Sequence, residues 1–414
     1  MTLTPQNILF IIIVITVIGY VFEQILDFIN LRAQRGDIPK EIADFYDQEK
    51  YLKSLQYHRE LTNFSFLSSA FGFIITMIML TTGGFGWLDV ELQKHVSHPI
   101  LKALLFFGIL MLAGDIITIP FQWYSTFVIE EKYGFNKTTV KTFILDKLKG
   151  YALSAIIGGA LLSVMLYLIL SIGENFWIWF AAIACVFMLL VNMFYTSWIL
   201  PLFNKLTPLP DGELKNQIES FSQKVNFPLD NIYVIDGSKR SNKANAFFSG
   251  IGRKKKIVLY DTLIKNHSNE ELIAVLAHEV GHYKKRHIIL SFVLSVLQVI
   301  FTLFILSRLI FNEDLSLALG GNMLSLSLNL VAFGILFSPI SGITGLLMMI
   351  ISRRNEYEAD AYARQTYDGR ALANALKRLS VDNLSNLYPH PAYVFFHYSH
   401  PPLLKRLAAL TIPA

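Results

Sequence analysis

Stretches without charged side chains recur along the chain and alternate with polar connections. They occur at 1–22, 61–88, 150–173, 175–204, 288–307 and 315–352, and a seventh at 103–129 is interrupted only by Asp115. A helix needs about 20 apolar residues to cross the roughly 30 Å hydrocarbon core of a bilayer. The pattern therefore predicts seven transmembrane helices, with a kink at Pro339 in the last. Asp115 is costly in lipid, so we expect it to face the interior or a partner side chain.

Basic residues distinguish the two sides of the predicted membrane. One set of connections contains several acidic residues and a single basic one, Lys94. This set comprises 85–99, 172–175 and 312–321. Nearly all other basic residues lie in the alternate connections. The positive-inside rule then predicts an outside N-terminus and a cytosolic C-terminus. The stretches expected to share the cytosolic face are 29–60, 130–149, 200–287 and 352–414.

The polar stretch after the fifth span is long enough to fold. It opens with a turn rich in Pro and Gly, and its periodicity predicts a helix at 213–225, strands at 231–235 and 256–260, and a helix at 270–287. Further helices are predicted at 353–378 and 402–410. We therefore expect helices one to five in 1–204, a folded domain in 205–287, helices six and seven in 288–352, and the rest of the folded domain in 353–414.

Composition narrows the class of protein. Hydrophobic residues make up 53% of the chain and charged residues 16%, well below the roughly 25% typical of soluble domains. This excludes an ordinary soluble protein and a disordered chain. The single cysteine, Cys185, excludes a disulfide scaffold and a Cys-rich metal module. The net charge of +5 fits basic cytosolic loops, so we expect no nucleic-acid partner.

The segment from Leu276 to His282 carries the clearest chemical motif, with His278, Glu279 and His282 in an HExxH arrangement. Residues four apart project from one face of a helix, so both histidines can reach one metal ion. The carboxylate beside them can take a proton from metal-bound water. The motif predicts a catalytic Zn²⁺ site with one ion per chain and Glu279 as general base.

A catalytic zinc needs a third protein ligand and an open position for water. A third histidine six residues on is excluded by Ile288, and His287 falls off the ligand face, so we interpret it as a membrane-interface residue. Glu356 and Asp360, again four apart, are the leading candidates, one as ligand and the other as hydrogen-bond partner of a ligand histidine. Glu358 lies off that face and is interpreted as structural.

Motifs spread over most of the chain, in a fixed order, point to one family. They are FVIEEKYGFN at 127–136, SKRS at 238–241, NAFFSG at 245–250, IVLYDT at 257–262, HEVGH at 278–282, EYEAD at 356–360 and SHPPLLKRL at 399–407. This set resembles the type I CAAX prenyl proteases, which are zinc-dependent membrane endopeptidases that trim prenylated proteins. The resemblance implies a mainly α-helical fold in which seven transmembrane helices enclose a chamber, with a zincin-like α+β metalloprotease domain on the cytosolic side.

The resemblance also implies roles for individual residues. It implies zinc ligation by His278, His282 and Glu356, with Glu279 as general base. His400 would stabilise the oxyanion of the tetrahedral intermediate, and Arg406 and Asp360 would support the site.

Substrate binding is implied for a neighbouring segment. Asn245, Ala246 and Phe247 would lie on an edge strand that pairs with the extended substrate backbone. Family members often have His-Ser where this chain has Lys243 and Ala244. Zinc binding should survive that change, but substrate contacts near Lys243 are expected to differ.

The expected function is removal of the C-terminal tripeptide from prenylated CaaX proteins or peptides. The alternative is a bacterial-type membrane protease for quality control of membrane or misfolded proteins. A channel or transporter with a regulatory metal would need polar residues spread over several spans, and the spans show few of them.

Location and assembly follow from the same features. The C-terminal residues 411–414 contain no Lys-based retrieval signal and the loops are short, which favours a bacterial cytoplasmic membrane, or the endoplasmic reticulum if the source is eukaryotic. We expect a monomer whose partners are the lipid bilayer and a peptide or prenylated protein substrate.

Overall fold

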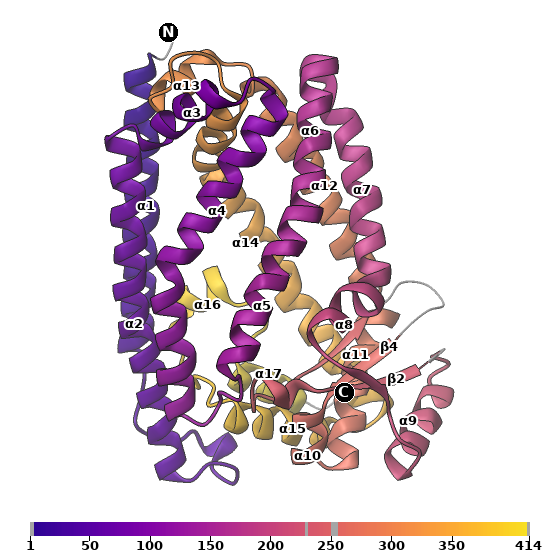
Figure 1. The fold of residues 1–414 in the computed structure, drawn as a ribbon. Helices are drawn as coiled ribbons and strands as arrows, with labels where there is room; N and C mark the ends of the chain where they lie inside the picture. The colour runs from indigo at the N-terminus through magenta and orange to yellow at the C-terminus, as the bar shows by residue number, and fades with distance from the viewer. Residues whose placement is uncertain (1–3, 228–230, 250–255, 412–414) are drawn as a thin grey trace.

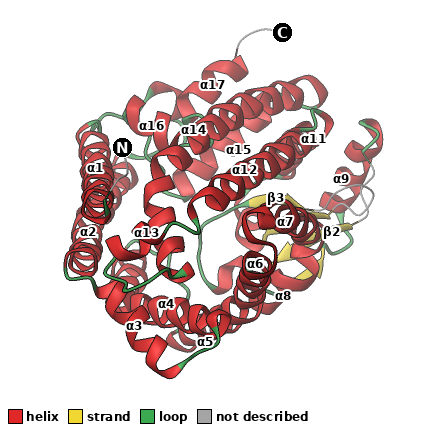
Figure 2. Ribbon diagram, turned by 90° about the horizontal axis from the view of Figure 1, so that it is seen from above, coloured by secondary structure: helices red, strands yellow, loops and turns green. Residues whose placement is uncertain are grey.

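Long helices dominate the computed structural model, which describes residues 4–227, 231–249 and 256–411. They stand side by side, with a small sheet and shorter helices gathered at one end (Figure 1). Seen from above, the long helices form a ring (Figure 2). The described part of the chain is therefore mainly α-helical with a small sheet, as the sequence predicts.

Within the described residues, six helical segments are long and apolar enough to cross a membrane. The fourth, 64 residues long, turns back at Gly173–Asn175, so that two of its helices lie side by side. The exact number of spans, seven, stays a prediction. The main helices of these segments are α1 (Pro5–Arg32), α2 (Gln48–Thr81), α4 (Pro99–Tyr124), α5 (Val140–Leu153), α6 (Gly159–Ile172), α7 (Phe176–Phe194), α12 (His287–Leu309) and α14 (Leu326–Thr366).

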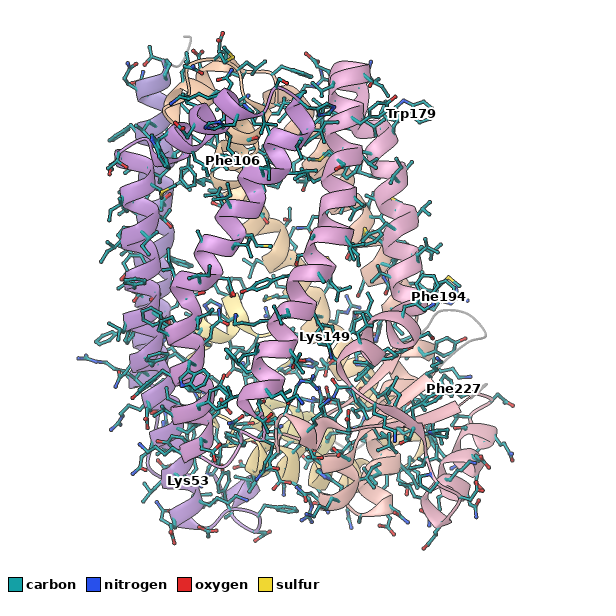
Figure 3. All side chains as sticks on the ribbon, in the orientation of Figure 1. Lys53, Phe106, Lys149, Trp179, Phe194 and Phe227 are labelled. Atoms are coloured by element: carbon teal, nitrogen blue, oxygen red, sulfur yellow. The ribbon has the colours of Figure 1, made fainter. Side chains whose placement is uncertain are left out.

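The surface of these helices is apolar where lipid would cover it. Trp179 on α7 points away from the bundle (Figure 3), and its side chain is exposed. Asp115, the charged residue within a predicted span, is paired. The Asp115 carboxylate on α4 accepts hydrogen bonds from Lys147 at 2.8 Å and from Gln122 at 3.0 Å. The expectation of a partner for Asp115 is confirmed.

The end of the bundle opposite the sheet is closed by short elements (Figure 1). They are α3 (Gly84–His95) and α13 (Glu313–Ala318). In α3, the buried Asp89 carboxylate accepts hydrogen bonds from Lys102 at 2.9 Å and Ser325 at 2.8 Å. Gly86 packs so closely that a Cβ there would lie 2.0 Å from the carbonyl carbon of Gly320.

The loops divide between the two ends of the molecule as predicted. The connections poor in basic residues lie at the end with α3 and α13, and the basic stretches lie at the end with the sheet (Figure 1). Arg240, in the connection between the second and third strands of the sheet, pairs with Asp146 of α5 at 2.7 Å, so two of these basic stretches are joined by a direct contact. Which end faces the cytosol stays a prediction.

The folded domain is built around a four-stranded sheet of order β1-β2-β4-β3. Strands β2 and β4 are parallel, and the other neighbours are antiparallel. The sequence predicts β2 and β4 with the bounds observed, but it misses the three-residue β1 because that strand ends in a proline within a turn-rich stretch. The strands are β1 (Leu206–Pro208), β2 (Asn231–Ile235), β3 (Ala246–Ser249) and β4 (Lys256–Tyr260).

Helices cover the sheet and share its hydrophobic core. Ile218, Ile257, Leu272, Ala277 and Leu372 belong to one buried cluster that joins the sheet to α9, α11 and α15. Helices α10 and α17 contribute to the same cluster, whereas α16 packs against α14 and α1. The helices are α9 (Glu213–Lys224), α10 (Asp261–Asn266), α11 (Asn269–Lys284), α15 (Gly369–Asp382), α16 (Pro391–His397) and α17 (Leu403–Thr411).

Two predicted helix boundaries are wrong. The helix predicted to reach residue 287 ends as α11 at Lys284, and Arg286 adopts a left-handed conformation with φ of 61° before α12 begins. The helix predicted from residue 353 is instead the last part of α14, which continues through Pro339 from the membrane span. It ends at Thr366, and Asp368 caps the start of α15.

Candidate metal centre

Three side chains from two helices converge at the sheet end of the ring. His278 and His282 project from α11 and Glu356 from α14, and one potential ligand atom of each lies within 4.8 Å of the others. The two Nε2 atoms are 3.1 Å apart, and Glu356 Oε1 lies 3.1 Å from His282 Nε2. All three predicted metal ligands are therefore brought together.

The close packing of α11 on α14 makes this convergence possible. Gly281, inside the HExxH motif, faces α14, where a Cβ would lie only 3.0 Å from the Cα of Ala359. A Cβ at this position would require α11 and α14 to shift slightly from their present contact. At its other end α11 is fixed by a capping box, in which Ser268 and Glu271 bond to each other's backbone N–H.

A buried ion pair supports the ligand cluster from one side. Arg406 of α17 donates two hydrogen bonds to Asp360, at 2.6 and 2.8 Å. The same carboxylate lies 2.8 Å from His278 Nδ1. Burial lowers the pKa of His278, but Asp360 and Glu356 raise it by more, to about 9. The cluster thus favours positive charge at its centre, which is the electrostatic requirement of a metal site.

Glu279 is half-buried and lies at the edge of this cluster. It lines a cavity of about 350 Å³ together with His282, His287 and Asn355. The predicted general base therefore faces space next to the ligand atoms, where a small substrate group or water molecule can approach.

His400 reaches the cluster from the loop before α17. Its Nδ1 lies 2.9 Å from Glu356 Oε2, while 64% of its side chain is exposed. Arg353 fixes this loop, because its guanidinium donates to the carbonyl of Tyr398 at 2.6 Å. His400 is thus in contact with a ligand side chain and also accessible from outside.

His287 and Glu358 contact the site as well, which the sequence analysis missed. His287 Nδ1 is hydrogen-bonded to His282 Nδ1 at 3.1 Å, and its Nε2 to Glu358 Oε2 at 3.2 Å. On an unbroken helix, residues five apart point about 140° away from each other. The left-handed Arg286 removes that restriction, and no sequence pattern indicates such a break.

The predicted substrate-binding residues lie at the edge of the sheet. Ala246 and Phe247 belong to β3, which pairs with β4 alone among the described strands, and Asn245 immediately precedes it. The Asn245 side chain is exposed, and its Oδ1 accepts a hydrogen bond from the Ala246 N–H at 2.8 Å. Ala246 and Phe247 lie on an outer strand of the described sheet, whereas Asn245 lies just before that strand and not on it as predicted. Substrate binding stays a prediction.

Lys243, where the chain departs from the family pattern, has a local structural role. Its Nζ donates to the Tyr57 hydroxyl at 2.9 Å and to Glu130 at 3.1 Å, and lies 4.5 Å from the centre of the Phe135 ring. These contacts attach the segment before β3 to α2 and to the stretch after α4.

The donor set fits a zinc ion. Two imidazole nitrogens and one carboxylate are the protein ligands of a common type of catalytic zinc site, which leaves a fourth position open. Glu356 Oε2 is buried and makes no well-oriented hydrogen bond, so it has a lone pair available for a cation. The other ring nitrogens of both histidines face protein groups, which fixes their tautomers.

Comparison with known proteins agrees with this geometry. Residues 27–205 match the model of the CAAX prenyl protease N-terminal domain with five membrane helices, and residues 208–414 match that of peptidase family M48. A probable CAAX prenyl protease 1 of Schizosaccharomyces pombe is 37% identical over 90% of this chain and 81% of its own. CAAX prenyl protease 1 of Saccharomyces cerevisiae is 36% identical over 90% and 88%.

A solved structure is similar over almost its whole length. The crystal structure of S. mikatae Ste24p superposes with a TM-score of 0.92 at 33% sequence identity, covering 98% of this chain and 99% of that one. Sequence, fold and the geometry of the site therefore agree, and the chain is a multi-pass membrane metallopeptidase that belongs to peptidase family M48.

Proposed function

We propose that the chain is a zinc endopeptidase that removes the C-terminal tripeptide from prenylated CaaX proteins or peptides. The observation that carries this proposal is the convergence of His278, His282 and Glu356 beside the cavity that Glu279 lines. The substrate class is supported by the relatives from S. cerevisiae and human, which are named as CAAX prenyl protease 1 and its homolog.

Each residue of the site has a distinct task in this proposal. Zinc, held by His278, His282 and Glu356, would supply Lewis acidity and lower the pKa of a water in its open position towards about 7. Glu279 takes the proton of the attacking water and returns it to the leaving amine. His400 directs Nδ1 at Glu356, so Nε2 is the nitrogen that donates to the developing oxyanion.

The substrate backbone would add to the sheet. Strand β3 is an outer strand of the described sheet. One of its edges pairs with β4, and no described strand pairs with the other edge. An extended peptide beside β3 would form main-chain hydrogen bonds along Ala246 and Phe247, with Asn245 at the entrance. Such pairing tolerates varied side chains and holds the scissile bond in an extended conformation.

We also propose the orientation and assembly of the protein. The basic stretches at the sheet end favour the cytosol for the metal centre, in a bacterial cytoplasmic membrane or, for a eukaryotic source, the endoplasmic reticulum. One chain supplies all three ligands, which supports a monomer. Protease access to residues 205–287 in sealed vesicles of known sidedness tests the orientation, and light scattering of the purified protein tests the monomer.

The decisive experiment is cleavage of a farnesylated CaaX peptide by purified protein, followed by mass spectrometry. We expect release of the terminal tripeptide by the wild type. Glu279→Gln should keep its zinc, measured by elemental analysis, and lose about 10²- to 10⁴-fold in rate, because it removes the general base.

The control is Glu270→Gln, an exposed position in the first turn of the same helix, which should cleave like the wild type. More than a tenth of wild-type activity in Glu279→Gln would contradict the assigned base. If the protein cleaves an unprenylated membrane peptide and spares the farnesylated one, the quality-control function replaces the CaaX function.

A further inference from the structure

A line of hydrogen bonds leads from one ligand histidine to the protein surface. It begins at His282 Nδ1, continues through His287, whose Nε2 lies 3.2 Å from Glu358 Oε2, and ends at Arg354, whose Nε donates to Glu358 Oε1 at 3.2 Å. The His287 side chain is buried, with 6% exposed, whereas 38% of Glu358 and 81% of Arg354 are exposed. His282 lies near the end of α11 and His287 begins α12, whereas Glu358 and Arg354 lie one turn apart on α14, so the line forms only in the folded chain.

The direction of each hydrogen bond follows from the position of the ligand atoms. His282 turns Nε2 towards Glu356 and His278, so in a neutral ligand the proton resides on Nδ1. That N–H can only donate, which makes His287 Nδ1 the acceptor. His287 therefore carries its proton on Nε2 and donates it to the Glu358 carboxylate. A doubly protonated His287 would oppose two N–H donors across 3.1 Å.

The two ligand histidines are thus supported in different ways. His278 Nδ1 faces the buried Asp360, which is itself bound by Arg406. His282 Nδ1 faces a neutral imidazole whose own carboxylate partner is at the surface. Groups that accept the second N–H of a ligand histidine fix its ring and raise its basicity, and losing them typically costs about 10- to 100-fold in metal affinity.

We propose that His287 and Glu358 are positioning residues of the metal centre, which fix the ring orientation and tautomer of His282. This inference rests on the zinc site of the proposed function and adds two residues to it. In this role each acts through His282 and takes no part in the reaction itself.

The experiment measures zinc affinity by competition with a chromogenic chelator, using full-length protein in detergent. His287→Phe retains a flat ring but accepts no hydrogen bond, and we expect zinc affinity to fall by about 10- to 100-fold. His287→Gln offers an acceptor to His282 and a donor to Glu358, so it should recover most of the loss. The visible absorption spectrum of the Co²⁺-loaded protein should shift in His287→Phe and return towards wild type in His287→Gln.

A second pair of variants tests the outer end of the line and avoids the buried position. Glu358→Gln keeps an acceptor oxygen and loses the charge, so the fall in affinity should be smaller than in His287→Phe. Arg354→Gln is the matched control, because it removes the other partner of Glu358 and leaves the His287 bond intact; its affinity should stay within about twofold of wild type.

The outcomes separate this inference from the proposed function. Zinc affinity of His287→Phe within about twofold of wild type overturns the inference, and so does a loss in Arg354→Gln as large as that in His287→Phe. Failure of His287→Gln to recover affinity also counts against it. If the wild type binds no stoichiometric zinc, the proposed zinc function itself fails.

Discussion

At the scale of single residues, the buried Asp360 carboxylate contacts both Arg406 and the ligand His278. It accepts two hydrogen bonds from Arg406 and lies 2.8 Å from the second ring nitrogen of His278. Only 2% of its side chain is exposed. A buried carboxylate is stable only when its charge is compensated and its oxygens are bonded, and here the compensation also fixes a metal ligand.

Asp360→Asn is expected to weaken zinc binding by about 10- to 100-fold, because the amide keeps the volume and removes the charge that holds His278 and Arg406. The thermal unfolding temperature of the zinc-free protein should also fall, since the Arg406 charge is left buried without its partner. Chelator competition and a thermal-unfolding scan measure the two effects. Asp44→Asn, at an exposed position, should change neither, and equal values for both variants would contradict the assigned role.

The role of a residue could be predicted from sequence when its partners lie a few positions away in the chain, and not when they are distant in sequence. His278, Glu279 and His282 are recognisable alone, because four-residue spacing on a helix is itself the geometry of the site. Glu356 and Asp360 form a common surface pattern and gain meaning only beside that motif. His400 and Arg406 were assigned by family resemblance, because their contacts with Glu356 and Asp360 are tertiary. His287 was missed because its contact depends on a helix break.

At the scale of elements, type and position could be predicted better than ends. Apolar runs and β-branched residues mark the long helices and the two central strands. The end of α11 could not be predicted, because the break after it carries no Gly or Pro. The break after α14 carries the Asp368-Gly369 pair, a turn signal that the predicted helix at 353–378 runs across. Arg286 takes a left-handed conformation, unusual for a residue with a side chain, and Tyr367 simply ends α14 before the cap at Asp368.

Contacts between elements give a prediction at the end opposite the metal centre. Gly86→Ala should lower the thermal unfolding temperature by an amount equivalent to about 1–3 kcal/mol, because the new Cβ would overlap the backbone of Gly320 and force α3 away from the turn after α13. A thermal-unfolding scan in detergent measures the change.

Gly72→Ala is the matched control for that substitution, because no heavy atom lies within 4 Å of a Cβ built at Gly72. It should leave the unfolding temperature unchanged or slightly raise it, since alanine favours helix over glycine. Identical unfolding temperatures for the two variants would show that α3 can move away from Gly320 without loss of stability.

At the scale of the whole molecule, the two halves of the metal centre are joined to the membrane helices differently. Glu356 lies on α14, a single helix of 41 residues that is about 62 Å long. No loop or turn separates its membrane part from its ligand part, and Pro339 within the membrane part is the point where it can bend. His278 and His282 lie on α11, which is separated from its own span, α12, by Arg286. A tilt of α12 can be absorbed at that break, whereas a tilt of α14 reaches the ligand.

From the continuity of α14 we expect the enzyme to be sensitive to the thickness of its bilayer. Spans adapt to thin or thick membranes by tilting, and a tilt of α14 would displace Glu356 relative to the two histidines. Peptide cleavage should therefore peak at one acyl-chain length when the protein is reconstituted in phosphatidylcholines from 14 to 22 carbons (roughly the range that spans biological thickness). A flat dependence would mean that the ring of helices holds α14 rigid, while a peak would make lipid composition a regulator of catalysis.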